Sequence, residues 1–186
     1  MEIFVSNPIA GLGTILTLYL AAAHPGIILQ NSADIASATL VTDAEIRTII
    51  DAAPEDRVSD VQLRMVDAGG YNIGIGVVQR PASAPGGAIE HDKQTEIYRI
   101  VAGSGTLITG GELIDSRRLA NDGDVVKNLT GPSSVGSGIR GGESRQVTAG
   151  DMVIIPAGVP HGFSALQADT TYLVVRVDPE QLVQLK

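Results

Sequence analysis

The stretch that decides the fold is GDMVIIPAGVPH, Gly150 to His161. Its apolar residues 152–155 predict a short buried strand. Pro156 ends that strand, because proline has no N–H to donate to a neighbouring strand. After a glycine turn, His161 stands at the head of a new strand that includes Phe163. The stretch therefore places one imidazole, a common metal ligand and general base, at the mouth of a β structure. A partly buried histidine without chemistry is the alternative.

The composition fits one β-rich domain. The chain has 186 residues, the length of a single domain, and its 22 glycines and 3% aromatic content favour strands and tight turns over a helical bundle. A net charge of −8 without a basic cluster argues against a nucleic-acid or anionic-membrane surface. No cysteine is present, which excludes disulfides and thiolate sites. A histidine metal site must therefore come from His24, His91 and His161.

Residues 1–30 differ from the rest of the chain. Ile9 to Ala23 is a largely apolar run that ends in small residues, a pattern compatible with a signal peptide. However, no Lys or Arg precedes Arg47. We expect either a cleaved secretory signal, which would give a secreted or periplasmic protein with no membrane segment after cleavage, or a cytoplasmic N-terminal extension.

The segment 31–57 is expected to be helical in part. Thr42 and Glu45 form a capping-box pattern, isoleucines follow at helical spacing, and Pro54 stops the run. The pattern predicts a short helix over 43–52.

From about residue 58 the period of the apolar residues changes to two. Alternating runs around a glycine-rich turn at 67–70 predict a hairpin, in which Gln79 shares an inward face with Ile75 and Val77. Further strands are expected at 96–101, 106–109, 139–147 and 171–177. The polar segment 110–138 is either a lid or binding loop, or disordered. Short strands with turns about every ten residues predict a β-barrel or sandwich.

A second stretch, HDKQTEIYRIVAG at 91–103, supplies the partners of His161. Glu96 begins a strand and shares one face with Tyr98. An inward carboxylate needs a partner, because burying an unpaired charge is costly, and a metal ion is one such partner. His91, Glu96 and His161 would form a two-histidine, one-carboxylate set. That set suits one divalent Fe, Mn, Ni or Zn ion and leaves coordination positions open.

At these residues the sequence resembles the cupin superfamily over roughly residues 58–178. The second cupin motif, G-x5-P-x-G-x2-H-x3-N, is matched at every position but the last, where Ala165 replaces Asn. The first motif, G-x5-H-x-H-x3–4-E-x6-G, is matched at His91, Glu96 and Gly103. Ser83 and Ile89 occupy its opening glycine and first histidine positions.

The resemblance implies an all-β fold: a single cupin-like jelly-roll barrel at 58–178, with a short N-terminal helix and a tail at 179–186. Cupins typically hold their metal with three His and one Glu, and Ile89 stands at one of these four positions. Three outcomes are open. Either the site functions with three ligands, or Asp92 or Gln79 supplies the fourth, or the metal has been lost.

The resemblance leaves two functions open. One is a metal-dependent enzyme, of oxygenase or lyase/isomerase type, that acts on a small organic molecule. The other is a non-enzymatic ligand-binding barrel with a vestigial metal site. For the enzyme we expect Tyr98 to handle a proton and Gln79 and Phe163 to contact substrate, although core packing is an alternative for each aromatic residue. By resemblance we also expect a homodimer.

Overall fold

The computed structural model describes residues 37–186, and every structural statement below concerns that part of the chain. The predicted signal or extension at 1–30, and His24 with it, lies outside these residues. The described part consists of α1 (Asp43–Asp51), β1 (Ser59–Asp67), β2 (Asn72–Arg80), β3 (Ala88–His91), β4 (Thr95–Thr109), β5 (Glu112–Ile114), β6 (Arg117–Arg118), the π-helical turn η1 (Val126–Thr130), β7 (Ser133–Gly136), β8 (Gly138–Arg140), β9 (Glu143–Thr148), β10 (Met152–Ile155) and β11 (His161–Asp178).

Helix α1 begins where the capping box predicts. The Thr42 hydroxyl accepts a hydrogen bond from the Glu45 N–H at 3.2 Å, and the Glu45 carboxylate accepts one from the Thr42 N–H at 2.8 Å. Glu45 also forms an ion pair with Arg64 of β1, which ties the helix to the barrel. Within residues 37–186, no helix has the length and apolar character needed to cross a membrane.

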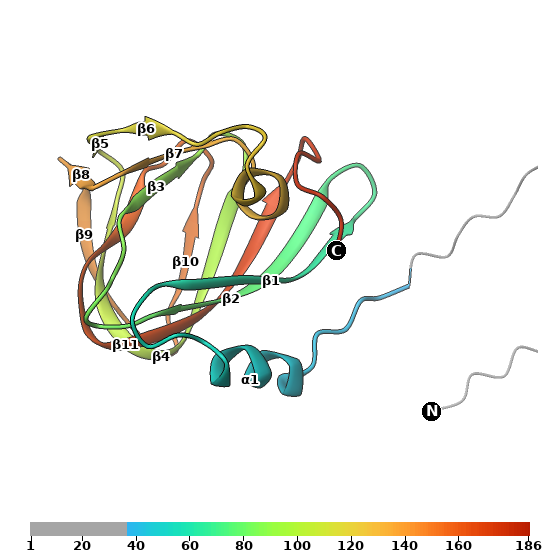
Figure 1. The fold of residues 1–186 in the computed structure, drawn as a ribbon, viewed down its shortest axis with the longest axis horizontal. Helices are drawn as coiled ribbons and strands as arrows, with labels where there is room; N and C mark the ends of the chain where they lie inside the picture. The colour runs from blue at the N-terminus through green and yellow to red at the C-terminus, as the bar shows by residue number, and fades with distance from the viewer. Residues whose placement is uncertain (1–36) are drawn as a thin grey trace, which may run out of the picture. The chain divides into compact units, whose positions relative to one another are not determined.

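The strands form one antiparallel barrel (Figure 1). The main sheet runs in the order β1-β2-β11-β3-β7-β6, and β4 pairs with β9, β10 and β11. A small second sheet pairs β5 with β8. Strand β11 holds the barrel together, because its 18 residues pair in turn with β2, β3 and β4. The all-β jelly-roll barrel with one short N-terminal α-helix is therefore confirmed.

Strand β4 is longer than the sequence predicts. We expected a turn at 103–105 and separate strands on either side, but β4 continues through this region as one strand of 15 residues. Gly103 has a φ of +80°, which bends the strand without reversing it. A Cβ at this position would lie 2.2 Å from the backbone oxygen of Asp169 in β11. Close approach of two paired strands, rather than a hairpin turn, is thus the reason for a glycine here.

This close approach makes Gly103 sensitive to substitution. We expect Gly103→Ala to destabilise the fold by more than about 1 kcal/mol, because the added methyl meets backbone in a conformation that alanine rarely adopts. Gly110→Ala is the matched control, since Gly110 has a similar φ of +77° but no atom within 4 Å of its added Cβ. Denaturant unfolding of both variants measures the difference. Equal losses would show that φ alone, and not the contact with β11, requires glycine at position 103.

The inward face of β2 is the opposite of the one predicted. Val78 belongs to the core, whereas Gln79 and Val77 lie on the outer face. Glycines occupy the next inward positions, and a Cβ at Gly76 would come within 3.2 Å of a guanidinium nitrogen of Arg176. The inward face was misassigned because glycines on the inward side of β2 leave room for the side chain of Arg176 from β11, so this face carries few apolar residues.

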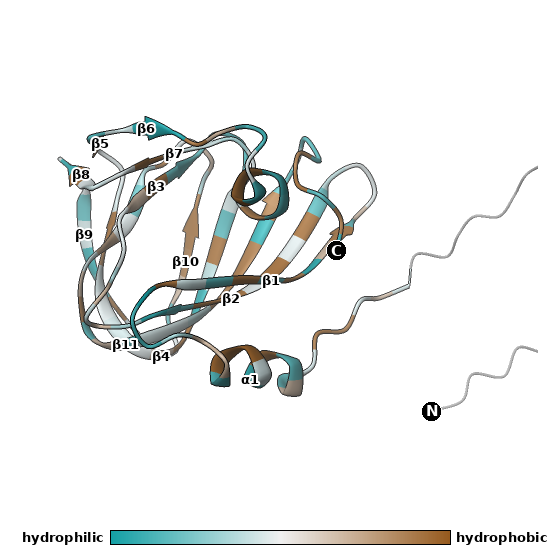
Figure 2. Ribbon diagram, in the orientation of Figure 1, coloured by the Kyte–Doolittle hydropathy of each residue, from teal (hydrophilic) through white to brown (hydrophobic). Residues whose placement is uncertain are grey.

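Strand β10 is apolar throughout (Figure 2), but it is not buried throughout. Ile155 is 2% exposed, whereas Met152 and Ile154 are 65% and 68% exposed on the outer face. The predicted buried strand is thus buried on one face only.

The predicted strand at 139–147 is divided into β8 and β9 by two glycines. The segment 110–138 contains β5, β6, η1 and β7, so disorder is wrong for this segment.

Candidate metal centre

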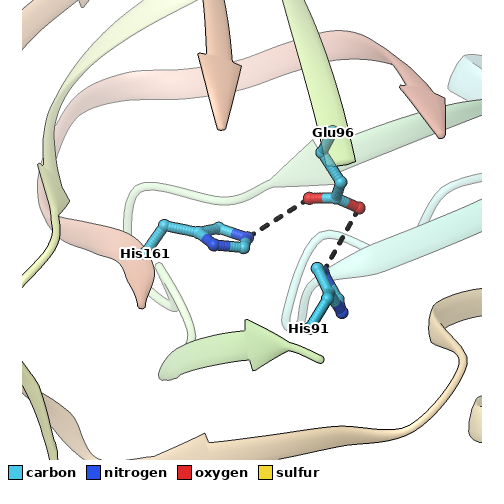
Figure 3. A group of neighbouring side chains, drawn as sticks. All are labelled: His91, Glu96 and His161. Carbon is cyan, nitrogen blue, oxygen red and sulfur yellow. Dashed lines mark ion pairs between the residues drawn. The ribbon is translucent and has the colours of Figure 1, made fainter. Parts of the chain in front are cut away.

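Three side chains from three strands meet inside the barrel. His91 ends β3, Glu96 lies near the start of β4, and His161 begins β11. They are 2–3% exposed, and one ligand-type atom from each lies within 4.8 Å of the others. Both imidazoles point toward the Glu96 carboxylate (Figure 3). The Gly158 N–H donates to the carbonyl oxygen of His91 at 2.7 Å, so the turn of the second motif is fastened directly to the first.

The hydrogen bond at the far side of the His161 ring fixes its tautomer. Its Nδ1 lies 3.0 Å from the carbonyl oxygen of Val159. A carbonyl only accepts, so we assign the ring hydrogen to Nδ1. In the neutral ring, the Nε2 lone pair is then directed at Glu96, whose Oε2 is 3.2 Å away. This buried Nε2 has no hydrogen-bond partner among the described residues.

The same logic applies to His91. Its Nδ1 lies 2.9 Å from the hydroxyl of Ser133, which is itself 3.0 Å from the carbonyl of Gly131 and 3.2 Å from that of Thr130. Because the single hydroxyl hydrogen is directed to a carbonyl, the hydroxyl accepts from Nδ1–H of His91. In the neutral ring, the His91 Nε2 lone pair therefore faces Glu96 Oε1 at 3.4 Å.

When both rings are neutral, two Nε2 lone pairs and the Glu96 carboxylate converge on one point. Two imidazole lone pairs and a carboxylate at these separations repel one another unless a cation lies among them. Each imidazole is oriented through its other ring nitrogen, as metal-binding histidines usually are. Nitrogen and oxygen donors of this kind fit a divalent transition metal. The residues present therefore fit the metal that the resemblance implies.

The Glu96 carboxylate is held on both oxygens. Arg176 Nε donates to Oε1 at 2.8 Å, and the Tyr98 hydroxyl donates to Oε2 at 2.7 Å. Burial alone raises the pKa of Glu96, but in the metal-free protein the positive charge of a protonated His91 and that of Arg176 outweigh burial and bring this pKa well below its usual value. Burial and the Glu96 charge raise the pKa of Tyr98 well above its usual value. Glu96 is therefore ionised, and Tyr98 is a hydrogen-bond donor rather than a base.

Sequence reasoning missed Arg176, which is 2% exposed at the centre of this network. Its Nη1 donates to Gln62 at 2.8 Å and its Nη2 to Asp60 at 2.6 Å, in addition to the bond to Glu96. A signal was available in the sequence. In the strand TYLVVRV, Arg176 alternates in phase with Tyr172 and Val174, which both belong to the core, so a charge at this position had to lie inside.

The group opens into a cavity of about 660 Å³, whose lining includes His91, Glu96 and Tyr98. Ile89 lines the same cavity and is the register partner of His161, so an apolar side chain stands at the first histidine position. Neither proposed substitute supplies a fourth ligand. Asp92 forms an ion pair with Arg118, and Gln79 is not part of the cavity lining.

The other predicted substrate contact lies at a distance from the metal-binding group. Phe163 is 5% exposed in the core, where its ring centroid is 6.0 Å from that of Tyr172. It lines a second cavity of about 300 Å³ that does not include either histidine of the group. A role for Phe163 in the main cavity would therefore act through Tyr172 and Arg80, which do line it.

Neither a protein-family model nor a curated protein sequence matches the chain. Among solved structures, it is similar to DMSP lyase DddQ from Ruegeria pomeroyi DSS-3, with 20% identity, a TM-score of 0.41, and coverage of 65% of this chain and 47% of the other. It is also similar to the L-ribose isomerase of Cellulomonas parahominis, with 12% identity, a TM-score of 0.43, and coverage of 65% and 61%. The EutQ protein of Clostridium difficile has 14% identity, a TM-score of 0.38, and coverage of 66% and 69%. The chain spans about half of the first and six-tenths of the second.

The two motifs found in the sequence lie on neighbouring strands of one barrel. Strands β3, β4 and β11 carry them, and β11 pairs with both of the others. The antiparallel jelly-roll architecture, the two motifs and the interior His-Glu-His group agree with one another. The chain is therefore an antiparallel jelly-roll barrel that resembles the cupins in its two motifs.

Proposed function

We propose that the barrel holds one divalent Fe, Mn, Ni or Zn ion at His91, Glu96 and His161 and is an enzyme of oxygenase or lyase/isomerase type acting on a small organic molecule in the adjoining cavity. The observation that carries this proposal is the orientation of the two imidazoles. Each Nδ1 is occupied by a neighbouring oxygen, and each Nε2, the nitrogen left to bind a metal in the neutral ring, faces the Glu96 carboxylate at 3.2–3.4 Å.

When bound, a divalent metal supplies Lewis-acid polarisation of a substrate oxygen at the coordination positions that three protein ligands leave open. The chain supplies the rest. Arg176 and Tyr98 fix the rotation of the Glu96 carboxylate. Tyr98 also lines the cavity, and because its one hydroxyl hydrogen is donated to Glu96, its oxygen is left to accept a hydrogen bond from a bound molecule.

A second candidate, a ligand-binding barrel without catalysis, is favoured by one observation. The positive charge of Arg176 already lies beside Glu96, so the carboxylate is charge-paired even without a metal. In that case Ile89 marks a site whose metal affinity has been lost. On either reading, the exposed Met152 and Ile154 support the homodimer expected from the resemblance.

Restoring the missing histidine separates the two candidates. If the three residues bind metal, Ile89→His should tighten binding about tenfold or more, because position 89 lines the same cavity and a third imidazole supplies the fourth ligand. Ile89→Leu is the matched control and should leave the affinity unchanged. Competition titration against a chelator measures both variants.

No tightening in Ile89→His would count against the three-ligand site. If metal is bound, oxygen-consumption assays on the iron-loaded protein and lyase and isomerase screens on the other metal forms define the reaction. Metal binding without turnover in any of these screens would favour the ligand-binding barrel.

A further inference from the structure

The cavity wall contains an arginine that has no acidic partner. Arg80 ends β2, is partly buried and lines the cavity together with Glu96 and Arg176. Arg176 is paired with two carboxylates, whereas Arg80 forms no ion pair with any residue in 37–186. Buried or half-buried cations are normally paired, because removing a charge from water is costly. Arg176 therefore has its counter-charges within the protein, whereas Arg80 lacks one among the described residues.

The protein contacts of Arg80 are all neutral. Its Nε donates to the Tyr172 hydroxyl at 2.9 Å, and its Nη1 donates to the carbonyl of Pro85 at 2.6 Å. The guanidinium also lies over the rings of Phe163 and Tyr172, at 5.6 and 5.9 Å from their centroids. A guanidinium has five N–H donors, and two are used here. The Nη2 group and one hydrogen of Nη1 remain without a partner in the described part of the chain.

The loop after β2 holds this guanidinium in place. Gly86 has a φ of +86°, and a Cβ there would lie 2.8 Å from Arg80 Nη1. Glycine at this position therefore serves both the turn and the close approach to the arginine. Two hydrogen bonds, two ring faces and the loop together fix the side chain before any ligand arrives, which lowers the entropic cost of binding.

The charge of the cavity also favours a negatively charged ligand. Six charged side chains line it, three acidic and three basic: Asp60, Glu96, Asp115, Arg80, Arg117 and Arg176. Their formal charges cancel, so a divalent cation at His91, Glu96 and His161 would leave the cavity with a net positive charge. A ligand that enters this cavity is favoured if it is an anion.

We infer that the substrate or ligand is a small organic carboxylate, and that Arg80 binds its carboxylate group beside the proposed metal site. The planar edge left free on the guanidinium suits a carboxylate, which can accept two parallel hydrogen bonds from it. The Tyr172 hydroxyl orients Arg80 by accepting the hydrogen bond from its Nε. The carboxylate would anchor the molecule while the rest of it extends toward Tyr98 and the His-Glu-His group. The inference rests on the proposed function for the position of the reacting end, but not for the carboxylate contact itself.

The test compares carboxylates with their uncharged amides. Butyrate, succinate and lactate, each with its amide counterpart, are titrated by calorimetry and ligand-observed NMR into the full chain, once metal-depleted and once loaded with zinc. We expect carboxylates to bind in preference to amides in both forms. Arg80→Gln should weaken carboxylate binding about 10- to 100-fold, the usual effect of losing charge-assisted hydrogen bonds. Arg80→Lys, which keeps the charge but loses the fork, should lie between the two.

Arg99→Gln is the matched control, because Arg99 is exposed and lies outside the cavity lining. Thermal melts establish that each variant is folded, and Arg80→Lys serves if Arg80→Gln is not. Equal binding of amides, no binding by any carboxylate, or binding unaffected at position 80 overturns the inference. Carboxylate binding that requires Arg80 in a protein that takes up no iron, manganese, nickel or zinc upholds the inference and refutes the metal-dependent function.

Discussion

Replacing His161 by alanine is expected to weaken the binding of a divalent transition metal by more than about 100-fold. Changing a residue that only orients a metal ligand costs 10- to 100-fold in affinity, so removing a ligand itself should cost more. In the structure, His161 contributes one of two imidazole nitrogens whose lone pairs face Glu96. Without it, one histidine and one carboxylate remain. Competition with a chromogenic chelator gives the affinity of wild type and variant under the same conditions.

The control for this experiment is His24→Ala. His24 is the third histidine of the chain and has no part in the proposed site, so its loss should leave the affinity unchanged. Circular dichroism of each variant establishes that the barrel is folded. Metal retained by folded His161→Ala with wild-type affinity would place the binding site elsewhere.

The second large effect is expected from Arg176→Met, which should destabilise the metal-free protein by about 3–5 kcal/mol. Arg176 is 2% exposed and is the positive partner of Glu96 and Asp60. Removing one member of a buried ion pair leaves the other uncompensated in a medium that solvates it poorly. Gln62 would lose its donor at the same time. Denaturant unfolding at neutral pH measures the loss.

Arg64→Met is the matched control, because the Arg64–Glu45 pair is about one-third exposed and screened by solvent. Its replacement should cause a far smaller loss. Saturating metal should stabilise Arg176→Met more than it stabilises wild type, since the cation would restore a positive charge beside Glu96. An Arg176→Met protein as stable as wild type would show that the network does not need its arginine. Equal stabilisation of both proteins by metal would show that the cation does not bind beside Glu96.

Much of the site could be predicted because its residues lie at turns with strong local signals. Pro156 ends β10, Gly158 makes the turn with a φ of +74°, and His161 begins the next strand, all within a single stretch. Glu96 and Tyr98 were placed on one face by a period of two, and the structure joins them by a hydrogen bond. Short-range rules are sufficient where backbone chemistry fixes the direction of the side chain.

The remaining features depend on contacts between residues far apart in the sequence. Arg176 lies 80 positions from Glu96 and 116 from Asp60, so neither pairing leaves a local trace. The tautomer of His91 depends on Ser133, 42 positions away. Gln79 was placed on the wrong face because two of the inward positions of β2, Gly74 and Gly76, are glycines, which give no apolar signal for that face. Each of these features depends on which side chains from different strands meet inside the barrel.

The measurement that tests the central claim most directly is the metal content of the protein, purified without an affinity tag, alongside His91→Ala. Elemental analysis should find about one iron, manganese, nickel or zinc ion per chain in the native protein, or after reloading, and none in the folded variant. No metal in the native protein even after reloading, or the same content in His91→Ala, would contradict a metal site at His91, Glu96 and His161.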